Sequence, residues 1–191
     1  TSDSNFSWSE YVRRNNDELV ATFGNLVHRV LSMTNRYFDG VVPEPKGQDD
    51  LDKTLMAKAS ETLSLVANEL ENCRFRRALE HSMSLAQEAN RYLDEKAPWS
   101  AAKNDPDSAG NTLYHCLNVI NCLKTTFAPI LPFSVEKLHV MLGFEGTATD
   151  QGWNWNPNAV NPGHTLGEAK ALFIKLEDSV VDEEVSRLGI S

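Results

Sequence analysis

Apolar residues recur at helical spacing through the first part of the chain, and this pattern constrains the fold most strongly. They follow one another at steps of four and three residues: Leu19, Phe23, Leu26, Val30, Met33 and Tyr37. Residues at this spacing form a stripe along one side of an α-helix, which must be covered by other elements. An S-x-x-E capping box from Ser7 to Glu10 predicts the start of this helix, and Gly40 and Pro43 predict its end near Asp39.

Further segments have helical patterns, and none has a convincing strand pattern. Apolar stripes and breaking residues predict helices over about 50–70, 74–95, 113–127 and 134–142, and a last helix carrying Val181, Val185 and Leu188. We expect the break between the second and third helices near Asn72–Cys73. The predicted stripes of these two helices are Leu51, Leu55, Ala59, Leu63, Val66 and Leu70, then Phe75, Leu79, Met83, Ala86 and Tyr92 with Leu93. The sequence therefore predicts an all-α bundle.

Three other stretches are predicted from their turn-forming residues. Residues 103–110 (KNDPDSAG) read as a loop, and residues 145–163 as an irregular segment held to the bundle by Trp153 and Trp155. Thr165 to Glu168 has the form of a second capping box. We predict a single domain over 1–191, with a core bundle at about 7–144, an irregular connector at 145–170 and a C-terminal segment and helix at 171–189.

The cysteines and the hydropathy limit the class of protein. The three cysteines lack C-x-x-C spacing, which disfavours a disulfide framework or a zinc site. No apolar run reaches the roughly 18 residues that a membrane span needs, and the first residues lack the pattern of a signal peptide. We expect a cytoplasmic protein without a membrane partner.

Motifs of enzymes are missing. The five histidines are scattered, and there is no P-loop, G-x-S-x-G or G-x-G-x-x-G sequence. A di-iron bundle needs two E-x-x-H motifs, but the chain has only one, from Glu136 to His139. The sequence therefore predicts no catalytic residues and no metal site.

One flank of the first helix and one tryptophan are candidates for RNA binding. At about 100° per residue, Asn25, Arg29 and Arg36 share a flank beside the apolar stripe. Such side chains can read a base edge or contact phosphate, although an ordinary solvated helix side has the same composition. Trp99 follows Pro98, where it either packs under a turn or offers a platform for an unstacked base. The net charge of −9 argues against a broad RNA-binding surface but allows a local one.

Several stretches, in matching order, resemble the anticodon-binding domain of methionyl-tRNA synthetase. They are residues 15–29 (NNDELVATFGNLVHR), 37–43 (YFDGVVP), 90–99 (NRYLDEKAPW), 128–133 (APILPF) and 172–177 (LFIKLE). The resemblance covers nearly the whole chain, from about Trp8 to Leu188. It implies an antiparallel helix bundle of the anticodon-binding type found in class I tRNA synthetases.

The resemblance also implies a function and a set of site residues. In that family the domain reads the CAU anticodon of methionine tRNA, and the matching residues here are Asn25, Arg29, Pro98 and Trp99. Arg36 and Arg91 are expected to contact the RNA backbone. The HIGH and KMSKS signatures are missing, so the chain alone is not expected to charge tRNA.

The expected partners are the anticodon stem-loop of methionine tRNA and the synthetase catalytic domain, to which ATP and any zinc ion would belong. No cofactor is expected in this chain. Two alternatives remain open at this point. One is a helical protein-interaction module, derived from this domain, that no longer reads RNA. The other is the anticodon-binding bundle of a synthetase for another amino acid.

Overall fold

The computed structural model describes residues 6–189 and confirms the all-α class: within this range the helices are joined without any strand beyond one isolated bridge. The elements are α1 (Trp8–Arg14), the π-helix η1 (Asn15–Gly24), α2 (Asn25–Phe38), α3 (Asp50–Glu71), α4 (Phe75–Lys96), α5 (Pro98–Ala101), α6 (Pro106–Phe127), α7 (Pro132–Met141), the 3₁₀ turn η2 (Thr149–Gln151) and α8 (Ser179–Arg187). None of the helices in the described range has both the length and the apolarity needed to span a bilayer.

The first long helix has the predicted ends but not a uniform geometry. The Ser7 side chain accepts a hydrogen bond from the Glu10 amide, whereas the Glu10 carboxylate binds Arg13 and Arg14, so only half of the predicted capping box forms. α1, η1 and α2 then follow one another without a break, and the middle part has the wider π-helical turns. The helix ends at Asp39, whose backbone is left-handed with φ of 54°.

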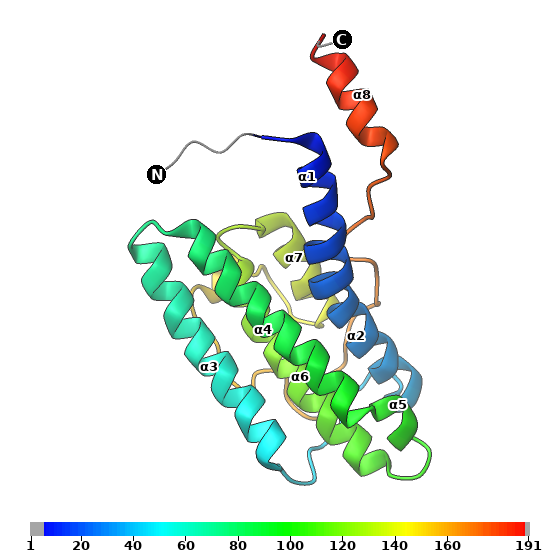
Figure 1. Cartoon of the computed structure of the whole chain (residues 1–191). Coiled ribbons are helices and arrows are strands. Elements are labelled where there is room, and N and C mark those ends of the chain that lie inside the picture. Colours follow the sequence, from blue (N-terminus) through cyan, green and yellow to red (C-terminus); the bar gives the residue numbers. More distant parts are fainter. Residues whose placement is uncertain (1–5, 190–191) are drawn as a thin grey trace.

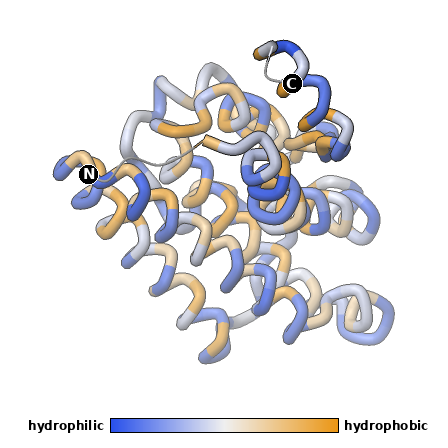
Figure 2. Tube along the Cα trace, turned by 45° about the horizontal axis from the view of Figure 1, so that its top comes forward, coloured by the Kyte–Doolittle hydropathy of each residue, from blue (hydrophilic) through white to orange (hydrophobic). Residues whose placement is uncertain are grey.

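The bundle is built around α6. In Figure 1, α3, α4 and α6 run side by side, and the α1–η1–α2 helix lies along the side of α4 away from α3. Every residue of α6 from Thr112 to Phe127 is buried, as expected for a helix surrounded by others. In Figure 2 the other long helices alternate between hydrophobic and hydrophilic stretches. Their apolar sides cover α6, so one core serves the whole bundle.

The helices α3 and α4 confirm two predictions, including the break between them at Cys73, where φ is 55°. Most of the predicted stripe residues lie in or against the core, but the two at the helix starts do not. Leu51 is 40% exposed and Phe75 is 60% exposed.

Three sequence predictions are wrong. Residues 103–110 do not form a loop throughout, because α6 begins at Pro106, with Asp105 as its N-cap. The sequence from Thr165 to Glu168 starts no helix. Trp153 is 40% exposed and does not hold the irregular segment, whereas Trp155 does, through a 3.0 Å hydrogen bond from its Nε1 to the Asn118 carbonyl.

Backbone hydrogen bonds, rather than a helix, hold the stretch in which the sequence predicts a second capping box. Residues 163–166 run antiparallel to 40–42: Val42 donates to the His164 carbonyl at 2.9 Å, and Leu166 donates to the Gly40 carbonyl at 2.8 Å. A Cβ atom on Gly143 would lie 2.1 Å from the Thr165 carbonyl oxygen, so only glycine permits this approach. The end of the irregular connector is therefore held close to the loop that follows α2.

The C-terminal segment also pairs with the first helix. The Asn16 side chain donates to the Leu176 carbonyl at 2.8 Å and accepts from the Leu176 amide at 2.9 Å. α8 then contacts α1, and Figure 1 shows both at the end of the molecule opposite α5.

A buried lysine leads to a testable pH dependence. Lys124 is 2% exposed, donates to Gln151 Oε1 at 2.6 Å and has no carboxylate within ion-pair distance among the described residues. Burial lowers its pKa from 10.5 to about 8. Between these values the unfolded chain binds more protons than the folded one, so stability should rise with pH from about 8 to 10.5, by at most about 1.4 kcal/mol per pH unit.

Urea unfolding from pH 7 to 10.5 would measure this slope, with Lys124→Met as the matched control. Since tyrosine and cysteine titration is common to both proteins, the difference between their free energies of unfolding reports Lys124. A difference that stays constant with pH would contradict the assignment.

Candidate nucleic-acid interface

The flank of α2 that carries Asn25 and Arg29 faces the C-terminal half of α4 across a surface depression of about 410 Å³. Its walls come from η1, α2 and α4: Ala21, Thr22, Asn25, Arg29, Gln87, Asn90, Arg91 and Asp94. Three of the predicted site residues, Asn25, Arg29 and Arg91, therefore line one concave surface.

Asn25 is the first residue of α2, and its side chain is exposed. Within the described residues its amide group makes no side-chain hydrogen bond to protein. It also borders a second depression, of about 460 Å³, between η1 and the C-terminal segment that includes Phe173. Asn25 therefore presents a donor and an acceptor that a ligand can use together.

Arg29 is held between two neighbours. Its Nη2 atom donates to Asp94 Oδ1 at 2.6 Å, and its guanidinium carbon lies 5.2 Å from the centroid of the Trp99 ring. The side chain remains 26% exposed. A cation this close to an indole ring is attracted to it, so the ion pair and the ring together order the guanidinium.

The corner between α4 and α5 presents Trp99. α4 ends at Lys96, its C-cap Ala97 has left-handed backbone angles with φ of 43°, and Pro98 is the buried first residue of α5. Proline suits the first position of a helix, because an N–H group at that position would have no hydrogen-bond acceptor within the helix. Trp99 is 41% exposed, so it is not enclosed under the turn and part of its ring is open to a ligand.

The two additional arginines lie in different places. Arg91 is exposed, lines the same depression and pairs with Glu88 one turn earlier. Arg36 is also exposed, but it lies farther along α2, where its guanidinium carbon is 5.5 Å from the centroid of the Tyr37 ring. Only Arg91 shares the depression with Asn25 and Arg29.

The sequence patterns missed three residues that α4 adds to this surface: Gln87, Asn90 and Asp94. Asn90 donates to the Thr22 carbonyl at 3.0 Å, which joins α4 to η1 directly beneath the depression. Its Oδ1 atom is buried without a protein partner among the described residues. The spacing 87, 90, 91 and 94 places these residues on one helix face, but no single-sequence pattern indicates that this face lies against the first helix.

The two residues of the E-x-x-H sequence have structural contacts. Glu136, of the E-x-x-H sequence, accepts hydrogen bonds from the Ala148 and Thr149 amides, and buried His139 contacts Lys124 and the Glu145 carbonyl. Within residues 6–189, no three His, Cys, Asp or Glu side chains are grouped as metal ligands. Burial raises the pKa of the Cys122 thiol to about 12, which leaves it protonated and unreactive.

Comparison with known proteins gives a consistent result. The profile described as "Anticodon binding domain of methionyl tRNA ligase" matches residues 42–190, and the profile "tRNA synthetases class I (M)" matches residues 1–31. Methionine–tRNA ligases of Dehalococcoides mccartyi and of a Roseiflexus species are 47% and 38% identical, over 100% and 98% of this chain. The chain spans only 34% and 36% of those relatives.

A solved structure agrees with these matches. The apo form of Mycobacterium tuberculosis methionyl-tRNA synthetase is similar with a TM-score of 0.83 at 27% identity, over 92% of this chain and 36% of that one. The chain therefore belongs to the methionyl-tRNA synthetase family, in which it corresponds to the anticodon-binding domain.

Proposed function

We propose that this chain reads the CAU anticodon of methionine tRNA as the non-catalytic part of a methionyl-tRNA synthetase. The observation that supports this most is the arrangement around Arg29, whose ordered guanidinium lies on one surface with the partly exposed Trp99 and the free amide of Asn25. The family membership of the chain supports the same reading. Its partners would be the tRNA and the synthetase catalytic domain, in the cytoplasm. ATP would bind the catalytic domain.

Each site residue has a chemical role in this proposal. The open part of the Trp99 ring stacks on an anticodon base, which needs no particular base identity. Arg29 and Asn25 supply the specificity, because guanidinium and amide groups can hydrogen-bond the edge of an unstacked cytosine. Pro98 is buried, so it acts by positioning Trp99 rather than by touching RNA.

Charge around the site is compatible with a short RNA loop. Arg91 lies at the edge of the depression and can contact a phosphate, and Arg36 can do so farther along α2. Their number is small, so electrostatic binding should be modest and should weaken as salt rises.

Replacement of Arg29 by glutamine tests the specificity role. We expect Arg29→Gln to lower the affinity for a CAU anticodon stem-loop by about fivefold or more, since a well-placed arginine contact to a base contributes about 1–3 kcal/mol of discrimination. The affinity for a loop with a changed first anticodon base should fall less. Fluorescence anisotropy with labelled stem-loops measures both.

Arg76→Gln is the matched control, because it removes the same charge from an exposed arginine on α4, about 22 Å along the helix from Arg91. It should reduce binding to both loops slightly and equally. Equal effects of the two substitutions would indicate nonspecific attraction to arginine and would contradict the proposal.

A further inference from the structure

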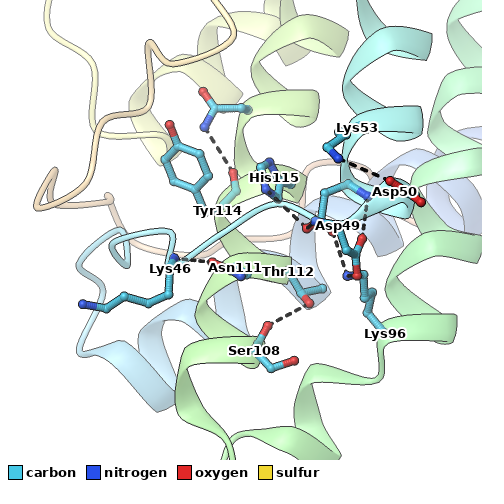
Figure 3. Close-up of polar contacts among 12 residues, drawn as sticks. Lys46, Asp49, Asp50, Lys53, Lys96, Ser108, Asn111, Thr112, Tyr114 and His115 are labelled. Atoms are coloured by element: carbon cyan, nitrogen blue, oxygen red, sulfur yellow. Dashed lines mark hydrogen bonds and ion pairs between the residues drawn. The ribbon is translucent and has the colours of Figure 1, made fainter.

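A buried polar cluster lies beside the corner that carries Trp99. At its centre is the Asp52 carboxylate, which is 1% exposed. Asp52 Oδ1 accepts a 2.7 Å hydrogen bond from the Tyr92 hydroxyl and lies 2.8 Å from Lys96 Nζ. Lys96 also lies 2.5 Å from Asp49 Oδ2, and Figure 3 shows these two side chains pointing toward each other, with His115 nearby.

The two aspartates are fixed by the start of α3. Asp49 Oδ1 accepts a hydrogen bond from the Asp52 amide at 3.0 Å, and Asp52 Oδ2 accepts one from the Asp49 amide at 2.9 Å. This reciprocal capping box leaves the other oxygen of each carboxylate directed at Lys96. The ammonium group therefore joins the end of α4 to a rigid anchor on another helix.

Lys96 lies directly before the corner between α4 and α5. It is the last residue of α4, and the next residue, Ala97, has a left-handed backbone that a residue with a Cβ atom adopts only at an energetic cost. Such a conformation persists where the surrounding structure enforces it. Pro98 and Trp99 follow immediately, so a change at Lys96 acts on the direction in which the indole ring points.

The cluster keeps its charges. Burial opposes the charged form of Lys96, but its hydrogen bonds with Asp49 and Asp52 outweigh this effect and raise its pKa. The hydrogen bond from Lys96, together with that from the Asp52 amide, lowers the pKa of Asp49 to about 2. The ion pair between Lys96 and Asp49 therefore persists at neutral pH, with only 14% of the Lys96 side chain exposed.

We infer that Lys96 is a positioning residue for base recognition: held by Asp52 and Asp49, it fixes the corner between α4 and α5 and thereby sets the place of the Trp99 ring beside Arg29. The inference rests on the proposed function, because it assigns Lys96 a role that acts through Trp99. Lys96 itself is too enclosed to serve as a phosphate contact of its own.

The test is a double-mutant cycle on binding of the CAU stem-loop by the 191-residue chain. Lys96→Met keeps an unbranched side chain, one atom shorter, and removes its charge, while Asp52 retains the Tyr92 hydroxyl and the Asp49 amide as partners. We expect about a fivefold loss of affinity when Trp99 is present, which corresponds to losing part of one stacked base. In the Trp99→Ala background the same substitution should have no further effect.

Lys53→Met is the matched control, since it removes an exposed lysine that pairs with Asp50 in the first turn of α3. It should change affinity little in either background. Asp49→Asn is a second test that keeps a good N-cap while removing one of the two charges that hold Lys96. It should lower affinity in the same direction as Lys96→Met, and it decides the question if Lys96→Met does not fold.

The inference is overturned if folded Lys96→Met binds like Lys53→Met, or if its loss is the same with and without Trp99. Failure of the proposed function gives a different result. The unchanged chain would then bind the CAU loop and a loop with a changed first base equally.

Discussion

Replacement of Trp99 by alanine is expected to weaken binding of a CAU anticodon stem-loop by about fivefold to 150-fold. Stacking of one base on an aromatic side chain is worth about 1–3 kcal/mol, which corresponds to this range of affinity. The ring is 41% exposed at a corner fixed by a buried proline, so its removal takes away a surface for a base and leaves the core unchanged. Titration of labelled stem-loop with the unchanged and substituted chains measures the effect.

Trp153 provides a matched control for this experiment. It is 40% exposed, almost the same as Trp99, but it lies in the irregular segment after α7. Trp153→Ala should bind the stem-loop as tightly as the unchanged chain. If the Trp99→Ala protein is folded and binds equally well, Trp99 does not stack on the anticodon.

The largest expected effect on stability comes from Phe23. Its side chain is fully buried in η1, its ring centroid lies 4.6 Å from that of Phe127 on α6 and 5.8 Å from that of Phe173 in the C-terminal segment. Truncation leaves a cavity among three segments, so Phe23→Ala should lower the free energy of unfolding by about 3–5 kcal/mol. Urea unfolding followed by circular dichroism measures this loss.

Phe133→Ala is the matched control, because it removes the same atoms from a side chain that is 85% exposed on α7. It should change stability by less than about 0.5 kcal/mol. Similar losses in both proteins would contradict the packing described for η1. The position of Phe23 also matters for the site, since η1 leads directly into Asn25.

The long elements were predictable because each carries its own local signals. The stripe from Leu19 to Tyr37 marked the first helix, and the break near Cys73 was expected between the stripes of two successive helices. The π-helical turns of η1 were not predictable, because the apolar residues there have α-helical spacing and π-helices are rare. The start of α6 at Pro106 was missed because proline and aspartate mark both loops and first turns.

Only part of the candidate site could be predicted from spacing. Asn25 and Arg29 are one turn apart on one helix, so periodicity places them together. The contacts of Arg29 with Trp99 and Asp94 depend on how α4 packs against the first helix, about 65 residues later in the chain. Such long-range pairing leaves no local pattern, and the expectation for Trp99 came from the family resemblance. The Asp52–Lys96 contact was missed for the same reason.

The most direct test of anticodon reading is a titration of the chain into two labelled stem-loops, one with CAU and one with its first anticodon base changed, at low and moderate salt. We expect tighter binding to the CAU loop at both salt concentrations, by about fivefold or more, with both affinities falling as salt rises. Equal affinity for the two loops would contradict recognition of the first base. Failure of both this chain and the full-length synthetase to bind either loop would contradict RNA binding at this surface altogether.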